Sequence, residues 1–255
     1  MLPKATHPRG LPVIFLLLAL AFSAAGADTN RFLLHAEIDF FHAQKKFLAN
    51  TIDAAAAQEF ARASFVYATL ATNETQRAEA AKAGIAACRQ LIARDPKSAP
   101  GHYYLGANLG ELAQAVAPSM AAYKLVHEVE HEFKLAAELD VRFDYAGPAR
   151  TLGSLYFQAP SWPLSVGSKS KAREWLERAA ELAPEYPENL LNLAEAQLKW
   201  RQKAEAAKTL RMLAALWPAA KNNFAGEARE NDWLDWTARR AAVEAEFKNL
   251  FQTAP

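Results

Sequence analysis

The chain has 255 residues, of which 51% are hydrophobic and 22% charged, and its formal net charge is +1. This composition suits a globular protein that buries an apolar core. The near-zero charge excludes a basic surface for nucleic acid or anionic lipid. The single cysteine, Cys88, excludes an intramolecular disulfide, and its apolar neighbours predict that it is buried.

The first 27 residues have the pattern of a secretory signal. Lys4 and Arg9 precede an apolar run over residues 11–22, and small residues follow up to Ala27. This order predicts export, most simply to the periplasm, with cleavage after Ala27. The apolar run is shorter than the ~20 residues of a membrane-spanning helix, so we expect no span after cleavage. An uncleaved anchor is the alternative.

Residues 28–72 are expected to form N-terminal helices. Alanine is abundant there, and prolines are absent from Asp28 to Asp95. His35 and His42 stand two turns apart without a third ligand nearby, which predicts surface or boundary histidines. Asn73 followed by Gln76 predicts a capped helix start.

Residues 73–218 are expected to form tetratricopeptide-like repeats. In the last copy, apolar residues recur at helical spacing from Leu190 to Gln197 and from Ala206 to Ala214, and Trp217-Pro218 is expected to end it. Pro184 and Pro218 lie one tetratricopeptide period apart. In the copy before, the small Gly153 lets two helices approach closely. Weaker copies close near Asp95 and Asp140. The prediction is an all-α, tetratricopeptide-type α-solenoid of about four helix pairs with flanking helices.

Residues 219–255 are expected to form a C-terminal capping helix. Trp233, Trp236, Val243 and Phe247 make one apolar side. A solenoid needs such a helix to cover its last face. The alternative is that the tryptophans form an oligomer interface, where aromatic residues also concentrate.

The pattern His127-Glu128-x-x-His131 resembles the metal-binding helix of zinc hydrolases. Histidines at i and i+4 on a helix can both reach one Zn²⁺ while the glutamate polarises a bound water. The context disagrees, because Glu130 and Glu132 are charged and no third ligand follows at a known spacing. We therefore expect these five residues on the solvated side of a long helix. We expect no enzyme activity and no cofactor, with a zinc hydrolase as the alternative.

A family resemblance is carried by residues 103–110 and 147–189. The segments Tyr103-Tyr104-Leu105-Gly106, Gly147-Pro148-Ala149-Arg150 and Ala159-Pro160-Ser161-Trp162-Pro163 resemble the TPR-containing T component of TRAP transporters. The resemblance implies a periplasmic accessory protein that associates with a solute-binding protein, and it implies a homo-oligomer. The chain departs from the family in lacking a lipid-anchoring cysteine near the predicted cleavage site.

A binding groove is expected on the concave surface, formed by the first helix of each pair. If Leu152, Gly153 and Tyr156 face their partner helix, then Arg150, Ser154 and Phe157 point towards the concave surface. The residues so predicted, with their equivalents in neighbouring copies, are Tyr103, Ala107, Gly110, Arg150, Ser154, Phe157, Leu191, Glu195 and Lys199. This mixed surface suits a peptide segment or an amphipathic helix, and a small hydrophobic or carboxylate ligand is also compatible with it.

Two groove residues have alternative roles. Arg150 is expected either to hold a ligand carboxylate through two parallel hydrogen bonds or to pair with an acid of a neighbouring repeat. Trp162 is expected either to close the groove from the loop over residues 159–168 or to pack on the next repeat.

Overall fold

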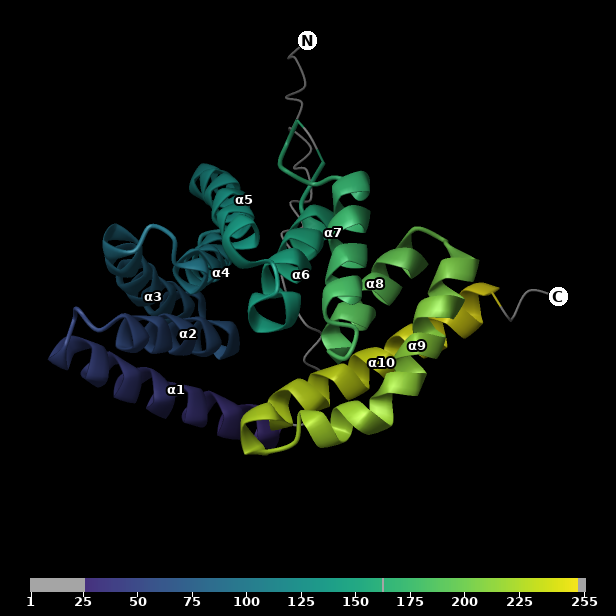
Figure 1. Ribbon diagram of the computed structural model, residues 1–255, viewed down its shortest axis with the longest axis horizontal. Helices are drawn as coiled ribbons and strands as arrows, with labels where there is room; N and C mark the ends of the chain where they lie inside the picture. Colours follow the sequence, from purple (N-terminus) through teal and green to yellow (C-terminus); the bar gives the residue numbers. More distant parts are fainter. Residues whose placement is uncertain (1–25, 162, 252–255) are drawn as a thin grey trace, which may run out of the picture.

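The computed structural model describes residues 26–161 and 163–251, with side chains from Arg31 onward. The predicted signal and its apolar run lie almost wholly outside these residues, as does Trp162. Within them the chain forms ten α-helices and one 3-10 helix (Figure 1). The helices are α1 (Gly26–Ala49), α2 (Ala54–Leu70), α3 (Glu74–Arg94), α4 (Ala99–Ala115), α5 (Met120–Asp140), α6 (Phe143–Gln158), α7 (Lys169–Leu182), α8 (Pro187–Lys199), α9 (Lys203–Asn223), η1 (Glu227–Arg229) and α10 (Glu230–Phe251).

The helices stack as successive antiparallel pairs, which confirms the predicted all-α solenoid. α2 packs with α3, α4 with α5, α6 with α7 and α8 with α9, while α1 and α10 flank the four pairs. The stack curves until its two ends meet, so that α1 and α10 lie along one edge (Figure 1). Arg31 of α1 donates to Glu230 of α10 at 2.9 Å. None of the described helices is both long and apolar enough to cross a membrane.

Side-chain caps fix where five of the described helices begin. The Asn73 carboxamide accepts from the main-chain N–H of Gln76 at 2.9 Å, and the Gln76 side chain reaches back to Thr72. This confirms the predicted helix start, since both contacts satisfy N–H groups that a helix leaves without partners. The other side-chain caps are Asp53, Ser98, Ser119 and Ser168.

Small residues allow the paired helices to touch. A Cβ added to Gly153 of α6 would lie 2.7 Å from the Leu176 side chain and 2.9 Å from its main-chain nitrogen. A Cβ at Gly106 of α4 would lie 2.8 Å from the ring of Phe133 on α5. The prediction that Gly153 permits close approach is therefore confirmed.

One proline lies elsewhere than predicted. Pro218 does not end its helix, because α9 continues to Asn223, so the predicted boundary at residue 218 falls inside this helix. Pro148 stands near the start of the right-handed part of α6, after three residues with left-handed backbone. The missing N–H of Pro148 costs no helical hydrogen bond in that first turn.

The C-terminal helix packs into the last core. Trp236 and Val243 are buried, and Trp233, Phe247 and Leu250 pack against the same cluster from α8 and α9. The indole N–H of Trp233 donates to the main-chain oxygen of Phe224 at 2.8 Å. These contacts agree with a capping helix rather than with tryptophans presented to another molecule.

Candidate functional site: a concave groove

A groove runs across the inner helices α2, α4, α6 and α8, with α5 contributing to its floor. It holds about 600 Å³ of space between the side chains, part of it open to solvent. Most of its lining comes from the first helices of successive pairs.

One face of α4 supplies the wall of the groove. Tyr103, Ala107, Gly110 and Gln114 lie on this face at intervals of three and four residues. Ala107 and Gly110 leave the space open because they have almost no side chain. A Cβ added to Gly110 would have no atom within 4 Å. The hollow is thus a direct consequence of small residues at these positions.

Glu111 is a buried carboxylate at the edge of this wall. Its side chain accepts from the Thr69 hydroxyl at 3.0 Å and pairs with Arg77 at 3.5 Å. Burial raises the pKa of Glu111 to about 7, against the opposing effects of Thr69 and Arg77. Its charge therefore changes near neutral pH.

The opposite side of the groove is organised by a left-handed turn at Asp144–Ala146. The three residues have φ values of 49°, 54° and 62°. Left-handed backbone costs roughly 1–2 kcal/mol per L-residue, and it takes the carbonyl oxygens of Asp144 and Tyr145 out of the helical hydrogen-bond pattern. Such a turn needs other donors for these oxygens.

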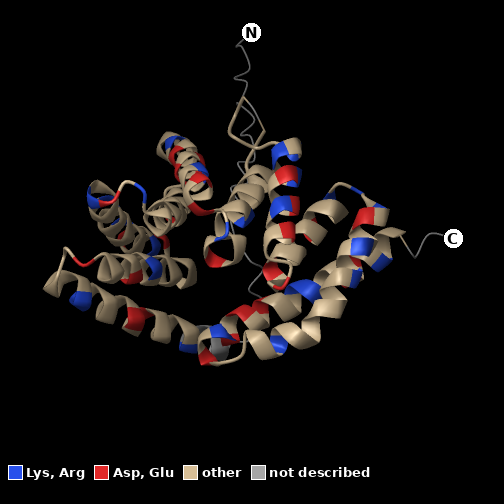
Figure 2. Ribbon diagram, viewed as in Figure 1, with Lys and Arg blue, Asp and Glu red and all other residues tan. Residues whose placement is uncertain are grey.

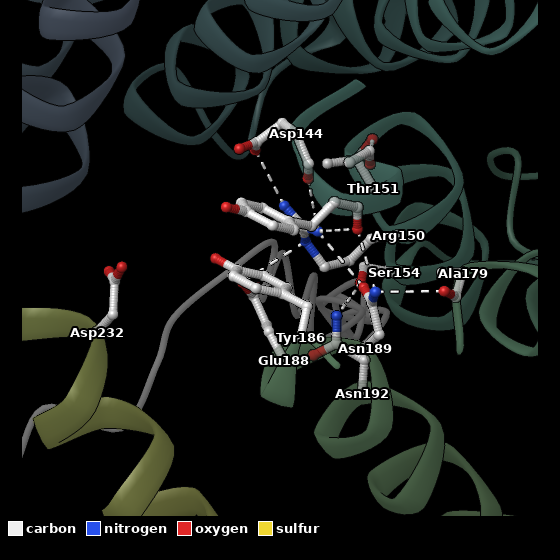
Figure 3. A network of polar contacts seen from close by, with 12 residues as sticks. Asp144, Arg150, Thr151, Ser154, Ala179, Tyr186, Glu188, Asn189, Asn192 and Asp232 are labelled. Atoms are coloured by element: carbon white, nitrogen blue, oxygen red, sulfur yellow. Dashed lines mark hydrogen bonds and ion pairs between the residues drawn. The ribbon is translucent and has the colours of Figure 1, made fainter. Parts of the chain in front are cut away.

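Arg150 and Asn189 supply those donors. The Arg150 guanidinium donates to the main-chain oxygens of Asp144 (3.2 Å) and Tyr145 (3.1 Å) and to the Asp144 carboxylate (3.2 Å). The Asn189 side-chain amide donates to the Tyr145 oxygen at 3.1 Å. Arg150 also pairs with Glu188 at 3.5 Å (Figure 3). The turn is held by side chains of two successive repeats, α6 and α8.

Aromatic rings enclose the same arginine. Its guanidinium carbon lies 4.9 Å from the centre of the Tyr186 ring, which stacks on Tyr145 with an interplanar angle of 6°. Burial raises the pKa of Tyr186 well above its usual range, and Glu188 raises it further. The acids Glu188 and Asp144 keep Arg150 charged despite its burial.

Acidic residues continue from this network onto α10. Figure 2 shows Asp and Glu at the turn that begins α6 and along the first half of α10. Burial raises the pKa of Asp235 to about 6, and it also raises the pKa of Asp232. Glu188 contributes to both shifts by charge repulsion. Arg150, Arg229 and Arg239 pair with Asp144, Asp232 and Asp235, so acids and arginines alternate at this end of the groove.

The predicted groove residues take different places. Tyr103 and Arg150 line the groove, together with Ser154, Ala107 and Gly110. The Arg150 guanidinium is engaged by Asp144 and Glu188, as in the predicted pairing with an acid of a neighbouring repeat. Its donors are directed at the protein rather than at a ligand carboxylate.

Phe157 does not line the groove. Its ring packs edge-on against Trp200, with the ring centres 5.8 Å apart. At about 100° per residue, Phe157 lies a quarter turn from the groove-lining face, which Thr151, Leu155 and Gln158 complete. The prediction for Phe157 was therefore wrong, because the assumed face of the helix was rotated.

The predicted positions on α8 are covered or lie apart from the groove. Both carboxylate oxygens of Glu195 accept from Arg239 of α10 at 2.8 Å. Lys199 is exposed near the end of α8, and Leu191 is fully buried in the core. The sequence reasoning missed Glu188 and Asn192, which do line the groove from α8. The proline start at Pro187 is the signal that would have set the correct face.

The histidines of the zinc alternative lie on the outer side of α5. His127 and His131 are exposed, and Glu128 pairs with Arg89 at 2.9 Å. No group of three potential metal ligands occurs among the residues described. Glu132 was expected on the solvated side but is buried, where it contacts His102 Nδ1 at 2.6 Å. The geometry does not favour a hydrolase.

Similarity to known proteins is found among solved structures. No protein-family model matches the chain, and no curated protein sequence is similar to it. A thermophilic TPR protein of Thermus thermophilus superposes with a TM-score of 0.57 and 17% identity, over 87% of this chain and 100% of that one. Pseudomonas aeruginosa pilF gives a TM-score of 0.45 and 15% identity, over 89% and 94% of the two chains.

The fold is a tetratricopeptide-type α-solenoid. The Thermus thermophilus structure supports this fold assignment over nearly the whole described chain. Solenoids of this type present extended concave surfaces, because each repeat is rotated slightly relative to the last. The groove described above occupies that surface.

Proposed function

We propose that this protein is a binding scaffold whose concave groove takes an extended segment of a partner protein. The observation that carries the proposal is the open wall of α4. Small side chains at Ala107 and Gly110 leave room there, between Phe65 on one side and Leu155 on the other. Apolar walls of this kind accept the side chains of a bound peptide.

Polar groups in the groove suit a peptide backbone. Gln114 presents a carboxamide that has no hydrogen-bond partner among the described residues, so it can donate to a carbonyl and accept from an N–H. Ser154 accepts from Asn192 at 3.2 Å and keeps its own hydroxyl donor.

A displayed library of random peptides tests the proposal. The library is selected for binding to the full chain and, separately, to the Gly110→Trp variant. The indole would project into the groove, and a Cβ at position 110 meets no protein atom within 4 Å. We expect enriched peptides to bind the parent chain and to lose at least tenfold in affinity for Gly110→Trp. Equal binding to both would place the binding surface elsewhere.

A narrower proposal concerns where the scaffold works. The signal-like residues 1–27 and the loop Ala159–Pro163 support export and an accessory role beside the solute-binding protein of a TRAP transporter. Fractionation of cells that express the full chain tests the first part. We expect a periplasmic protein whose first residue is Asp28. An intact N-terminus in the cytoplasmic fraction would contradict export and leave the groove proposal standing.

A further inference from the structure

The first helix has apolar residues on two opposite sides. One side packs on α2 and is buried; its residues are Phe32, Ala36, Phe40, Ala43 and Phe47. The other side faces solvent and is here named the outer stripe; its residues are Leu34, Ile38, Phe41, Lys45 and Leu48. At about 100° per residue, the outer stripe lies opposite the buried row.

Nothing in the described part of the chain covers the outer stripe. Leu34, Ile38, Phe41 and Leu48 are 53%, 43%, 53% and 65% exposed, and Ile52 in the following turn is 73% exposed. These make up five of the twelve large hydrophobic residues that are exposed in the described chain, gathered within 19 residues. Contiguous apolar surface of this kind marks an interaction site, whereas scattered exposed residues do not.

The spacing of the outer stripe is that of a coiled-coil seam. From Leu34 to Leu48 the intervals are four, three, four and three residues, whereas Ile52 lies in the turn after α1 and outside the helical series. This is the heptad pattern of two helices that pack side by side. The pattern therefore predicts a second helix of similar length as the partner. Binding to a bilayer or to an extended peptide would not require heptad spacing.

We propose that the outer stripe is a homodimer interface, in which α1 packs antiparallel against α1 of a second copy. Antiparallel pairing about a two-fold axis level with Ala43 brings Ile38 to Leu48 of the second copy, and it brings Leu34 towards the turn that carries Ile52. In this arrangement Leu34, Ile38 and Leu48 each have an apolar neighbour in the second copy, and Phe41 lies beside Lys45. The pairing is isologous, as expected for a closed dimer.

Lys45 decides the direction of the pair. A parallel pair in register would place Lys45 against its own copy in the seam, where two like charges repel. The antiparallel pair places Lys45 beside Phe41 of the second copy, and an ammonium over an aromatic face is attracted to it. The charge of Lys45 therefore disfavours the parallel pair and is compatible with the antiparallel pair.

The area is sufficient for a specific contact. The exposed apolar surface of the stripe is on the order of 500 Å² per copy, so a dimer would bury about 1,000 Å², the lower limit for a specific interface. A weak to moderate dimer is expected. The groove lies on the inner helices, so dimerisation does not depend on the proposed function.

Disulfide trapping in the full chain tests the arrangement. Ile38→Cys and Leu48→Cys chains are mixed under mild oxidation, with Asp39→Cys as a control on an exposed side of α1 away from the stripe. The native Cys88 is buried, and burial raises the pKa of its thiol, so it does not compete. We expect a mixed disulfide between the Ile38→Cys and Leu48→Cys chains, at least fivefold above the control.

Three outcomes would overturn the proposal. Disulfides that form mainly between identical variants would contradict the antiparallel direction. Cross-linking no greater than with Asp39→Cys, together with a monomeric mass in sedimentation equilibrium, would exclude the dimer. A monomer that binds phosphatidylcholine vesicles through Phe41 and Leu48 would identify a membrane as the occupant. Sedimentation of Leu48→Asp as a monomer, with the parent chain dimeric, would support the proposal independently.

Discussion

Arg150 contacts Asp144 twice, once through the main-chain oxygen and once through the carboxylate, at 3.2 Å in each case. The contact with the main-chain oxygen stabilises the backbone of Asp144, and the contact with the carboxylate holds the side chain of the same residue. Because the turn at Asp144 is left-handed, it has no helical donors for its oxygens. This relationship makes Arg150 the residue on which the acidic side of the groove depends.

Arg150→Ala is expected to destabilise the protein by about 3–5 kcal/mol, since it leaves buried carbonyls and the partly buried Asp144 and Glu188 without their cation. Urea denaturation followed by circular dichroism measures the change. Arg142→Ala is the matched control, because the Arg142 side chain makes one exposed contact, to the Leu182 oxygen; a loss of about 1 kcal/mol or less is expected. Equal losses for the two variants would refute the role of Arg150.

Gly153→Ala is expected to cost about 1–3 kcal/mol, because the added methyl would meet Leu176 at 2.7 Å and its backbone nitrogen at 2.9 Å. Gly110→Ala is the control on the groove wall. It meets no atom within 4 Å, and alanine favours helix by up to about 1 kcal/mol over glycine. Thermal melts should therefore shift in opposite directions. A Gly153→Ala variant as stable as the parent would disprove the close contact of α6 and α7.

Glu111→Gln is expected to remove part of the pH dependence of stability. The native carboxyl holds its proton up to about pH 7, whereas the unfolded one releases it near its ordinary value of 4.5. The native state therefore binds more protons between these values, and stability falls as pH rises through this window, by about 3 kcal/mol from this group. The raised pKa values of Asp235 and Asp232 also make stability fall as pH rises. The Glu111→Gln variant is therefore expected to keep a smaller pH dependence of stability.

Urea midpoints between pH 4.5 and 8 test this expectation. Glu205→Gln on α9 is the control, because Glu205 is exposed and lies outside the surroundings of Glu111. Its pH profile should match that of the parent. If Glu111→Gln kept the full slope, the buried carboxyl would not be its source.

Arg239→Ala is expected to cost about 1.5–3 kcal/mol, since it removes a partly buried cation from Glu195, Asp235 and Asn192 and weakens the attachment of α10 to α8. Lys248→Ala, an exposed position on the same helix, should change stability by less than about 0.5 kcal/mol. Denaturation is monitored by tryptophan fluorescence, to which Trp233 and Trp236 contribute two of the six tryptophans of the chain. An unchanged midpoint for Arg239→Ala would show that apolar packing alone holds α10.

The helix pairs could be predicted from the sequence, whereas the left-handed turn between two of these pairs could not. The spacing of Leu190, Leu193 and Gln197 follows from helical geometry, as does the position of Gly153 between two helices. The left-handed turn at Asp144–Ala146 depends on donors from Arg150 and from Asn189, which lies 44 residues from Tyr145 in the sequence. Local preference does not favour Tyr145 or Ala146 in that conformation.

The groove was predicted only in part, because local helix geometry positions some of its residues and tertiary contacts position the others. Tyr103, Ala107 and Gly110 follow from the period of α4, which begins at a well-marked cap. Phe157 and Glu195 were misplaced because the rotation of α6 is set by the turn before it, and because α10 returns to cover α8. Tertiary contacts of this kind have no local sequence signal.

Isothermal titration of a library-selected peptide against the full chain and against Gly110→Trp is the most direct test of the central claim, that the concave groove is the binding site. Equal melting temperatures of the two proteins serve as the control for folding. We predict micromolar or tighter binding to the parent chain and at least a tenfold loss for Gly110→Trp. Binding of equal strength to both proteins, or a library from which no peptide prefers the parent chain, would contradict the claim.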